Sequence, residues 1–126
     1  MMARLMRSGI VHVGFAFLAM GGWAAFANRA HPMPAPLQAG LLQGAISATI
    51  TLVLKRAIEY LANRFSGLTA LLAPPVIAGL VSASLLTILH TLSGTPEIAK
   101  TIAVPLTVAT SYAALYNYSL WRTRKA

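Results

Sequence analysis

Four long apolar segments limit what this chain can fold into more than any other feature. They lie at about residues 8–27, 37–57, 67–92 and 100–121. Each is close to or above the ~20 residues that a helix needs to cross a ~30 Å hydrocarbon core. Together they use most of the chain, so we expect an all-α membrane protein of one domain, residues 1–126. Its four transmembrane helices are predicted at about 8–27, 37–62, 67–92 and 97–121.

The composition agrees with a membrane environment. Of the 126 residues, 57% are hydrophobic and only 10% are charged, whereas soluble domains carry about 25% charged residues. Cysteine is absent, which excludes disulfides and thiolate metal ligands.

The basic residues predict the orientation in the membrane. On one side lie Arg4, Arg7, Lys55, Arg56, Arg64, Arg122, Arg124 and Lys125; on the other lie Arg29 and Lys100. By the positive-inside rule, both termini are cytoplasmic. We expect the bacterial inner membrane, where this charge sets topology and contacts anionic lipids. The net charge of +8 therefore does not predict nucleic-acid binding.

The N-terminal segment also resembles a signal peptide. Arg4 and Arg7 precede an apolar run that ends in the small residues Ala25 and Ala27, which fit a cleavage site. We interpret the segment as a transmembrane helix of the protein, not as a cleaved signal peptide.

Prolines mark loops and helix interiors. Pro32, Pro34 and Pro36 favour an extended loop after the first helix. A Ser or Thr in residues 93–97 is expected to cap the fourth helix. Pro74 and Pro75 lie inside the third helix, where we expect a packing kink. The alternative is a hinge, or a broken helix that exposes its backbone to a cavity.

A weak internal repeat has an offset of 64 residues. It pairs Pro32 with Pro96 and Ser47 with Ser111, together with small residues that match easily by chance. If the chain is duplicated, each half is a two-helix hairpin and the two hairpins are parallel.

Two ionisable residues, Lys55 and Glu59, lie near the inner end of the second helix. Glu59 and Glu97 are the only acidic residues of the chain. At 100° per residue, one stripe of this helix contains Gly40, Gly44, Ser47, Ala48, Thr51, Lys55 and Glu59. Small residues let membrane helices approach closely, so we expect Lys55 and Glu59 to face other helices. As an i,i+4 pair they can also interact directly.

A similar stripe is expected on the fourth helix, formed by Thr107, Thr110, Ser111, Ala114, Asn117, Tyr118 and Trp121. Depth along the helices then predicts a polar cluster of His12, Lys55, Glu59, Asn117 and Tyr118. Its cation, amide and phenol donors suit a lipid headgroup or another anion. Alternatively, Lys55 and Glu59 mark where the helix leaves the membrane. An interfacial aromatic belt on the same side would then contain Tyr60, Tyr116, Tyr118 and Trp121. Arg56 lies off the stripe and is expected to reach the headgroups.

On the opposite side, Arg29, His31, His90, Glu97 and Lys100 can converge. No metal-ligand spacing accompanies them, so we predict neither a metal nor a cofactor. The chain has no Asp and no glycine-rich phosphate loop. Glu59 and Glu97 are expected on opposite sides, which excludes a carboxylate pair within one chain. We therefore predict that the protein is not an enzyme.

The size, the four helices and the end of the fourth helix resemble the GtrA-like family. That family tends to end its second and fourth helices with Asn, then Arg and an aromatic residue. Asn117, Trp121 and Arg122 match this pattern in part, whereas the second helix departs from it with Lys55 and Arg56. The resemblance implies movement of polyprenyl-phosphate-linked sugars, as by a flippase, or anchoring of the glycosyltransferases that make them. It also implies that Asn117, Trp121, Lys55 and Arg56 lie near a lipid phosphate.

Two functions follow as expectations. The first is translocation or handling of a lipid-linked substrate by a homo-oligomer, because one four-helix bundle offers little room for a path. The alternative is a non-catalytic accessory or assembly subunit of a larger membrane complex. Membrane lipids are the expected partners in both.

Overall fold

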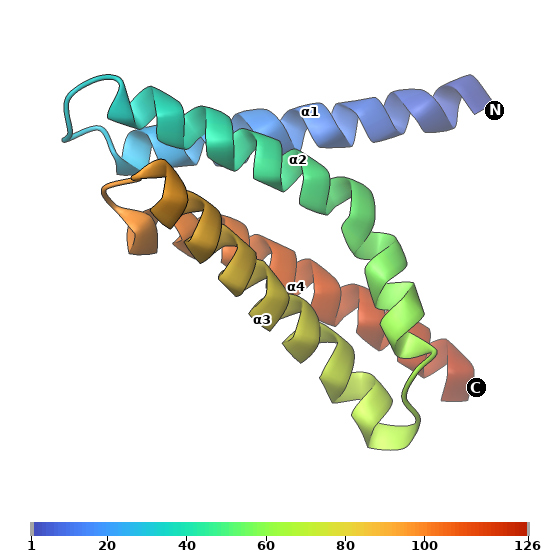
Figure 1. The fold of residues 1–126 in the computed structure, drawn as a ribbon. Helices are drawn as coiled ribbons and strands as arrows, with labels where there is room; N and C mark the ends of the chain where they lie inside the picture. The colour runs from blue at the N-terminus through green and yellow to red at the C-terminus, as the bar shows by residue number, and fades with distance from the viewer. Residues whose placement is uncertain (1, 126) are drawn as a thin grey trace.

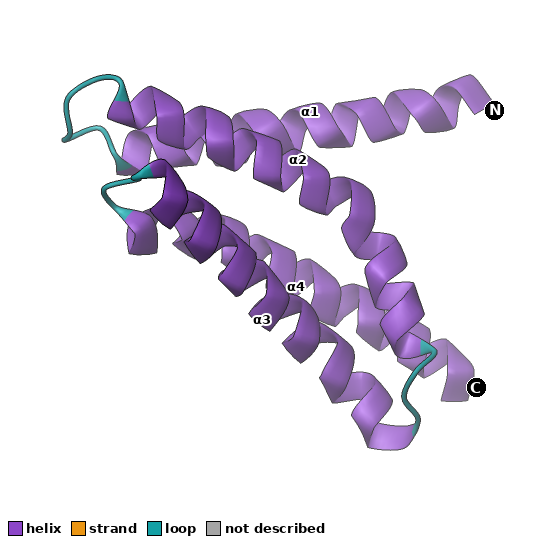
Figure 2. Cartoon of the chain, in the orientation of Figure 1, coloured by secondary structure: helices purple, strands orange, loops and turns teal. Residues whose placement is uncertain are grey.

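Four helices make up almost all of the structure. The computed structural model describes residues 2–125, and side chains are described for residues 9–124. The helices are α1 (Met2–Ala27), α2 (Ala35–Ala62), α3 (Gly67–Ser93) and α4 (Ile98–Lys125). Figure 2 shows the short loops that join them. The predicted all-α, four-helix class is confirmed, and α4 continues about one turn beyond its predicted end at residue 121.

The helices form two antiparallel hairpins, α1–α2 and α3–α4 (Figure 1). Helix α2 contacts the three other helices, whereas no contact joins α1 to α3 in the described residues. Both termini lie at one end of the molecule, which we call the terminal end. The loops 28–34 and 94–97 lie at the other, the distal end. Toward the terminal end α1 diverges from the other helices, whereas α2 bends away from α1 and stays packed on α4 (Figure 1).

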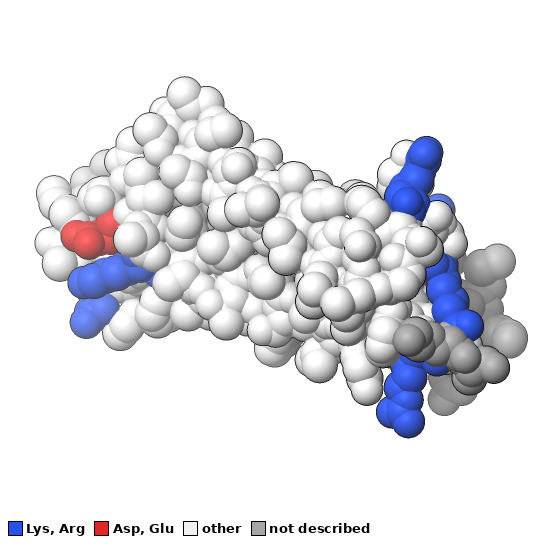
Figure 3. All heavy atoms as spheres, turned by 90° about the horizontal axis from the view of Figure 1, so that it is seen from below, with Lys and Arg blue, Asp and Glu red and all other residues white. Residues whose placement is uncertain are grey.

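All four helices are long and apolar enough to cross a membrane, over Gly9–Ala27, Ala35–Ala62, Gly67–Ser93 and Ile98–Arg124. This is the architecture of an integral membrane protein. Figure 3 shows one face, on which charged side chains gather at the two ends and leave an uncharged band between them. The side chains of Arg4, Arg7 and Lys125, which contribute to the predicted orientation, lie outside the described side chains.

Close packing of α1 on α2 depends on glycine. A Cβ atom added to Gly21 would lie 2.7 Å from the carbonyl oxygen of Gly40, and one added to Gly44 would lie 3.0 Å from the Phe17 side chain. Real Cβ atoms do not approach so closely, and small residues allow such backbone contact between membrane helices. The glycines of the α2 stripe therefore face α1, as expected for a packing face.

The contact face of α4 differs from the predicted stripe. Every fourth residue is buried: Thr101, Pro105, Ala109, Ala113 and Asn117. By contrast Thr107, Ser111, Ala114 and Tyr118 are exposed, so most of the predicted stripe is wrong. The Thr107 hydroxyl donates to the carbonyl of Ala103 at 2.7 Å, which satisfies it without a neighbouring helix. Ala109 and Ala113 pack with Leu54 and Ile58 of α2 as the apolar core.

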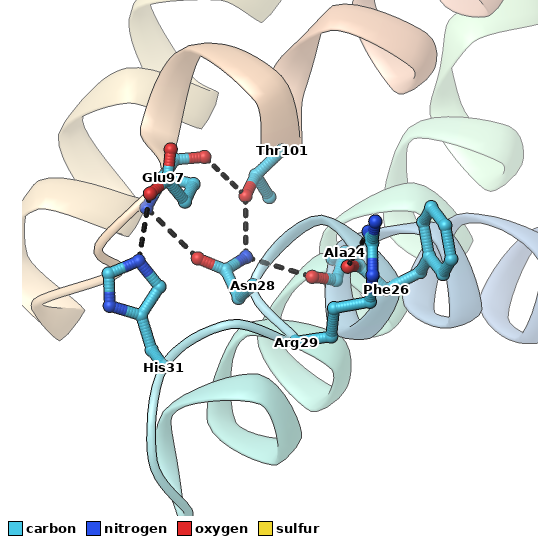
Figure 4. Close-up of polar contacts among 7 residues, drawn as sticks. All are labelled: Ala24, Phe26, Asn28, Arg29, His31, Glu97 and Thr101. Atoms are coloured by element: carbon cyan, nitrogen blue, oxygen red, sulfur yellow. Dashed lines mark hydrogen bonds and ion pairs between the residues drawn. The ribbon is translucent and has the colours of Figure 1, made fainter.

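Asn28 joins the two hairpins at the distal end (Figure 4). It is fully buried, and its Nδ2 donates to Thr101 Oγ1 at 2.7 Å and to the carbonyl of Ala24 at 2.8 Å. Its Oδ1 accepts from the backbone N–H of Glu97 at 2.9 Å. Glu97 lies just before the first residue of α4, where a Ser or Thr side chain was expected to cap the helix. The side-chain oxygen of Asn28, from the other hairpin, accepts from this N–H instead.

A second buried polar chain joins α2 to α3 at the same end. His90 Nε2 donates to Gln43 Oε1 at 2.8 Å, and Gln43 Nε2 donates to Ser47 Oγ at 2.8 Å. His90 Nδ1 lies 2.7 Å from Thr95 Oγ1. At the distal end, specific polar contacts therefore join the end of α1 to α4 and join α2 to α3.

Candidate functional site

A cavity of about 650 Å³ lies between the two hairpins. Its walls come from α1, α2 and α4, and α3 contributes none of the described lining residues. Its lining residues on α1 lie between His12 and Met20, and those on α2 and α4 between Ser47 and Lys55 and between Pro105 and Tyr112. Most of the lining is apolar, with Phe15 and Met20 on α1, Leu54 on α2 and Val108 on α4. Its volume lies within the ~300–1,000 Å³ usual for ligand sites.

The polar side chains of the cavity come from all three walls. They are His12, Ser47, Thr51, Lys55 and Tyr112. Ser47 already accepts a hydrogen bond from Gln43, and the Thr51 hydroxyl donates to the Ser47 carbonyl at 2.8 Å. In contrast, neither Lys55 nor His12 has a hydrogen bond or an ion pair with any described side chain. The cavity lining thus includes a cation and an imidazole that have no described partner, and both Lys55 and His12 are exposed.

Glu59 is held away from Lys55. The hydroxyl of Tyr116 on α4 donates to Glu59 Oε2 at 2.5 Å, and no ion pair joins Glu59 to Lys55. The Tyr116 ring stacks on that of Tyr112, with 5.8 Å between the ring centroids. Glu59 does not line the cavity. The direct Lys55–Glu59 interaction that the spacing allows is therefore not formed, and the described partner of the carboxylate is Tyr116 on α4.

Asn117 faces α3 instead of the cavity. Its Nδ2 donates to the carbonyl oxygens of Ala70 and Leu71, both at 2.9 Å. In a regular helix these carbonyls would accept from residues 74 and 75, and both are proline, which has no N–H. Asn117 thus satisfies the carbonyls that the two prolines leave free, and α3 continues as one helix. The alternative to a packing kink, a broken helix that exposes its backbone to a cavity, is not found at these positions.

The remaining predicted site residues lie at the terminal end. Trp121 Nε1 donates to the carbonyl of Gly67 at 3.0 Å. Tyr118 is exposed, and its ring lies 6.2 Å from that of Trp121. Arg56 is exposed on α2. The structure therefore brings His12 and Lys55 to one cavity and places Glu59, Asn117 and Tyr118 elsewhere. Their assignment to a headgroup site stays a prediction.

Tyr112 is the cavity residue that the sequence analysis missed. It lies on the α4 face that also carries Pro105, Val108 and Ala109, at spacings of three and four residues. The signal was present in the i,i+4 spacing of Tyr112 and Tyr116. The stripe of Thr and Ser residues on α4 instead predicted that a different face of this helix contacts its neighbours.

The predicted convergence at the distal end is only partly formed. His31 Nε2 donates to Glu97 Oε2 at 2.8 Å, and this hydrogen bond is the main cause that lowers the pKa of Glu97 below its ordinary value of 4.5. His90 is instead buried between α2 and α3, and the Arg29 guanidinium lies 3.8 Å from the centroid of the Phe26 ring. Among the described residues, no group of three His, Cys, Asp or Glu could hold a metal ion.

Four membrane-length helices and a cavity between two hairpins define a small integral membrane protein with a candidate ligand site. No family model, curated protein or solved structure matches this chain. Its function is therefore argued from the cavity.

Proposed function

We propose that the protein handles a lipid-linked anionic substrate, such as a polyprenyl-phosphate sugar, and takes part in its translocation across the bacterial inner membrane. The observation that supports this proposal is Lys55, which has no described partner in a largely apolar cavity. An unpaired charge in a membrane protein is costly. A bound anion offsets that cost, and the apolar walls suit the hydrocarbon part of the same ligand.

The position of the cavity supports a lipid ligand over a small soluble one. Its walls include the exposed side chains of Phe15 and Val108, so it is open to the bilayer between α1 and α4. A lipid could enter sideways with its tail among these side chains and its phosphate between Lys55 and His12. No acidic side chain lies in the described lining to repel that phosphate.

The test is lipid binding by native mass spectrometry with a panel of lipids. We expect undecaprenyl phosphate to bind the unaltered protein more tightly than undecaprenol, and Lys55→Gln to abolish that difference. Arg64→Gln is the control, because Arg64 is a basic residue at the same end of the molecule and lies outside the cavity lining. Equal binding of both lipids to the unaltered protein would refute the proposal.

A second function, as a non-catalytic accessory subunit, is favoured by a different observation. Four large apolar side chains of α1 are exposed within the described residues, namely Ile10, Val11, Phe15 and Leu18. A partner helix could dock there. This function predicts that the protein isolated from native membranes contains a different membrane protein in fixed stoichiometry, whereas a homo-oligomer with bound lipid supports the first. In both functions the protein acts without enzymatic activity.

A further inference from the structure

The hydrogen bond between Tyr116 and Glu59 has a consequence for Lys55. Lys55 and Glu59 are one helical turn apart on α2, a spacing at which Lys and Glu commonly form an ion pair. Tyr116 donates to the Glu59 carboxylate at 2.5 Å, whereas Lys55 forms no ion pair with Glu59 and lines the cavity as an exposed residue.

Glu59 is the acidic residue nearest to Lys55 along the helix, and the only other acid, Glu97, lies at the distal end. If Glu59 were released from Tyr116, it would therefore be the one carboxylate able to neutralise Lys55. Inside a membrane protein such an ion pair is stronger than on a solvated helix surface, because the low dielectric weakens screening. An anionic ligand would then have to compete with Glu59 for the lysine.

The geometry points to Tyr116 as a positioning residue that keeps Lys55 free for an anion. Tyr116 acts through Glu59 and does not line the cavity itself. Its ring is held by stacking on Tyr112, which does line the cavity, so the wall of the cavity and the position of the carboxylate are linked. This inference rests on the proposed function for the identity of the anion as that of a lipid-linked substrate. The release of Glu59 can be tested without any ligand.

The first experiment measures how fast an amine-specific reagent modifies Lys55, resolved by mass spectrometry. Lys100 at the distal end is the internal reference. We expect Tyr116→Phe to slow modification of Lys55 about two- to tenfold, the range that corresponds to a new ion pair of ordinary to moderate strength. The double variant Tyr116→Phe/Glu59→Gln should restore the original rate, which a merely structural role of the tyrosine would not do. Tyr60→Phe, which removes an exposed hydroxyl that accepts a hydrogen bond from Arg64, should have no effect.

An unchanged rate in Tyr116→Phe, or a slow rate that Glu59→Gln fails to restore, would overturn the inference. Glu59→Gln alone tests it without altering the tyrosine ring. Because Tyr116 already holds this carboxylate, we expect the rate at Lys55 to stay within about twofold of that in the unaltered protein. A much larger increase would show that Glu59 already neutralises Lys55, which contradicts the inference.

Binding of undecaprenyl phosphate to the same variants separates this inference from the proposed function. We expect binding to weaken in Tyr116→Phe and to recover in the double variant. If the reaction rates change as expected but no variant binds the lipid, the proposed function fails and the role of Tyr116 stands. If the unaltered protein binds the lipid and the rates do not change, the role of Tyr116 fails and the proposed function stands.

Discussion

Asn117 supplies to α3 the hydrogen-bond donor that Pro74 lacks. Its Nδ2 lies 2.9 Å from the carbonyl oxygen of Ala70, four residues before Pro74, and it also reaches the next carbonyl, four residues before Pro75. One amide side chain on α4 therefore replaces two backbone N–H groups of α3. This contact joins the two helices of the second hairpin and keeps polar backbone groups satisfied inside the bilayer.

We expect Asn117→Leu to destabilise the protein by about 1–3 kcal/mol, because it leaves two carbonyls without a donor in a buried position. The measurement is the free energy of unfolding in detergent micelles. Ser111→Ala, on the exposed side of α4, is the matched control. If the assigned role is correct, the cost of Asn117→Leu shrinks when Pro74 and Pro75 are both replaced by alanine, which restores the backbone donors. An undiminished cost in that background would contradict it.

The packing of α1 on α2 gives a second prediction. Gly21→Ala places a Cβ atom against the backbone of Gly40 and should destabilise the protein by about 1–3 kcal/mol through overpacking. Gly22→Ala is the matched control, since no atom lies within 4 Å of its added Cβ. That neighbouring change should be neutral or stabilise by about 0.5–1 kcal/mol, because alanine favours the helix. Equal thermal stability of the two variants would show that the close contact is not formed.

The His31–Glu97 contact predicts a pH effect at the distal end. The hydrogen bond from His31 lowers the pKa of Glu97 in the folded protein, so the unfolded chain binds a proton more readily there. The contact therefore stabilises the folded state above the ordinary pKa of 4.5. That contribution is lost as the pH falls through the lowered pKa.

An NMR titration of the Glu97 carboxyl carbon measures this pKa, with Glu59→Gln used to assign the signal. We expect His31→Ala to raise the pKa of Glu97 toward its ordinary value. Lys100→Gln should raise it less, because the Lys100 charge is a smaller cause of the shift than the hydrogen bond. A pKa that His31→Ala leaves unchanged would disprove the assigned cause.

The fold could be predicted because the bilayer imposes it. Segment length and hydropathy predict α1 to α4 within a few residues, since only helices of about this length satisfy the backbone in lipid. The glycines of α2 also predicted a helix contact, because small residues allow two membrane helices to approach closely. Which helix they contact, α1, was not encoded in the stripe itself.

The site could be predicted only in part, because the sequence does not show which partner each polar side chain contacts. Lys55 and His12 share a cavity, as their depth suggested. Asn117 looked like a headgroup ligand, yet its role depends on two prolines 43 and 42 residues earlier in the chain. Glu59 looked like a partner for Lys55, yet a tyrosine on α4 takes its carboxylate. These partners are determined by tertiary contacts, which helical periodicity does not predict.

The central claim, that the cavity holds a lipid-linked anion, is tested most directly by photo-crosslinking from inside it. A photoreactive phenylalanine analogue replaces Phe15, which lines the cavity, or Leu18, which is exposed on the same helix outside the lining. We expect position 15 to capture undecaprenyl phosphate in preference to undecaprenol, and Lys55→Gln to remove that preference. Capture at position 18 that is as strong and as selective, or capture at position 15 that does not depend on Lys55, would contradict the claim.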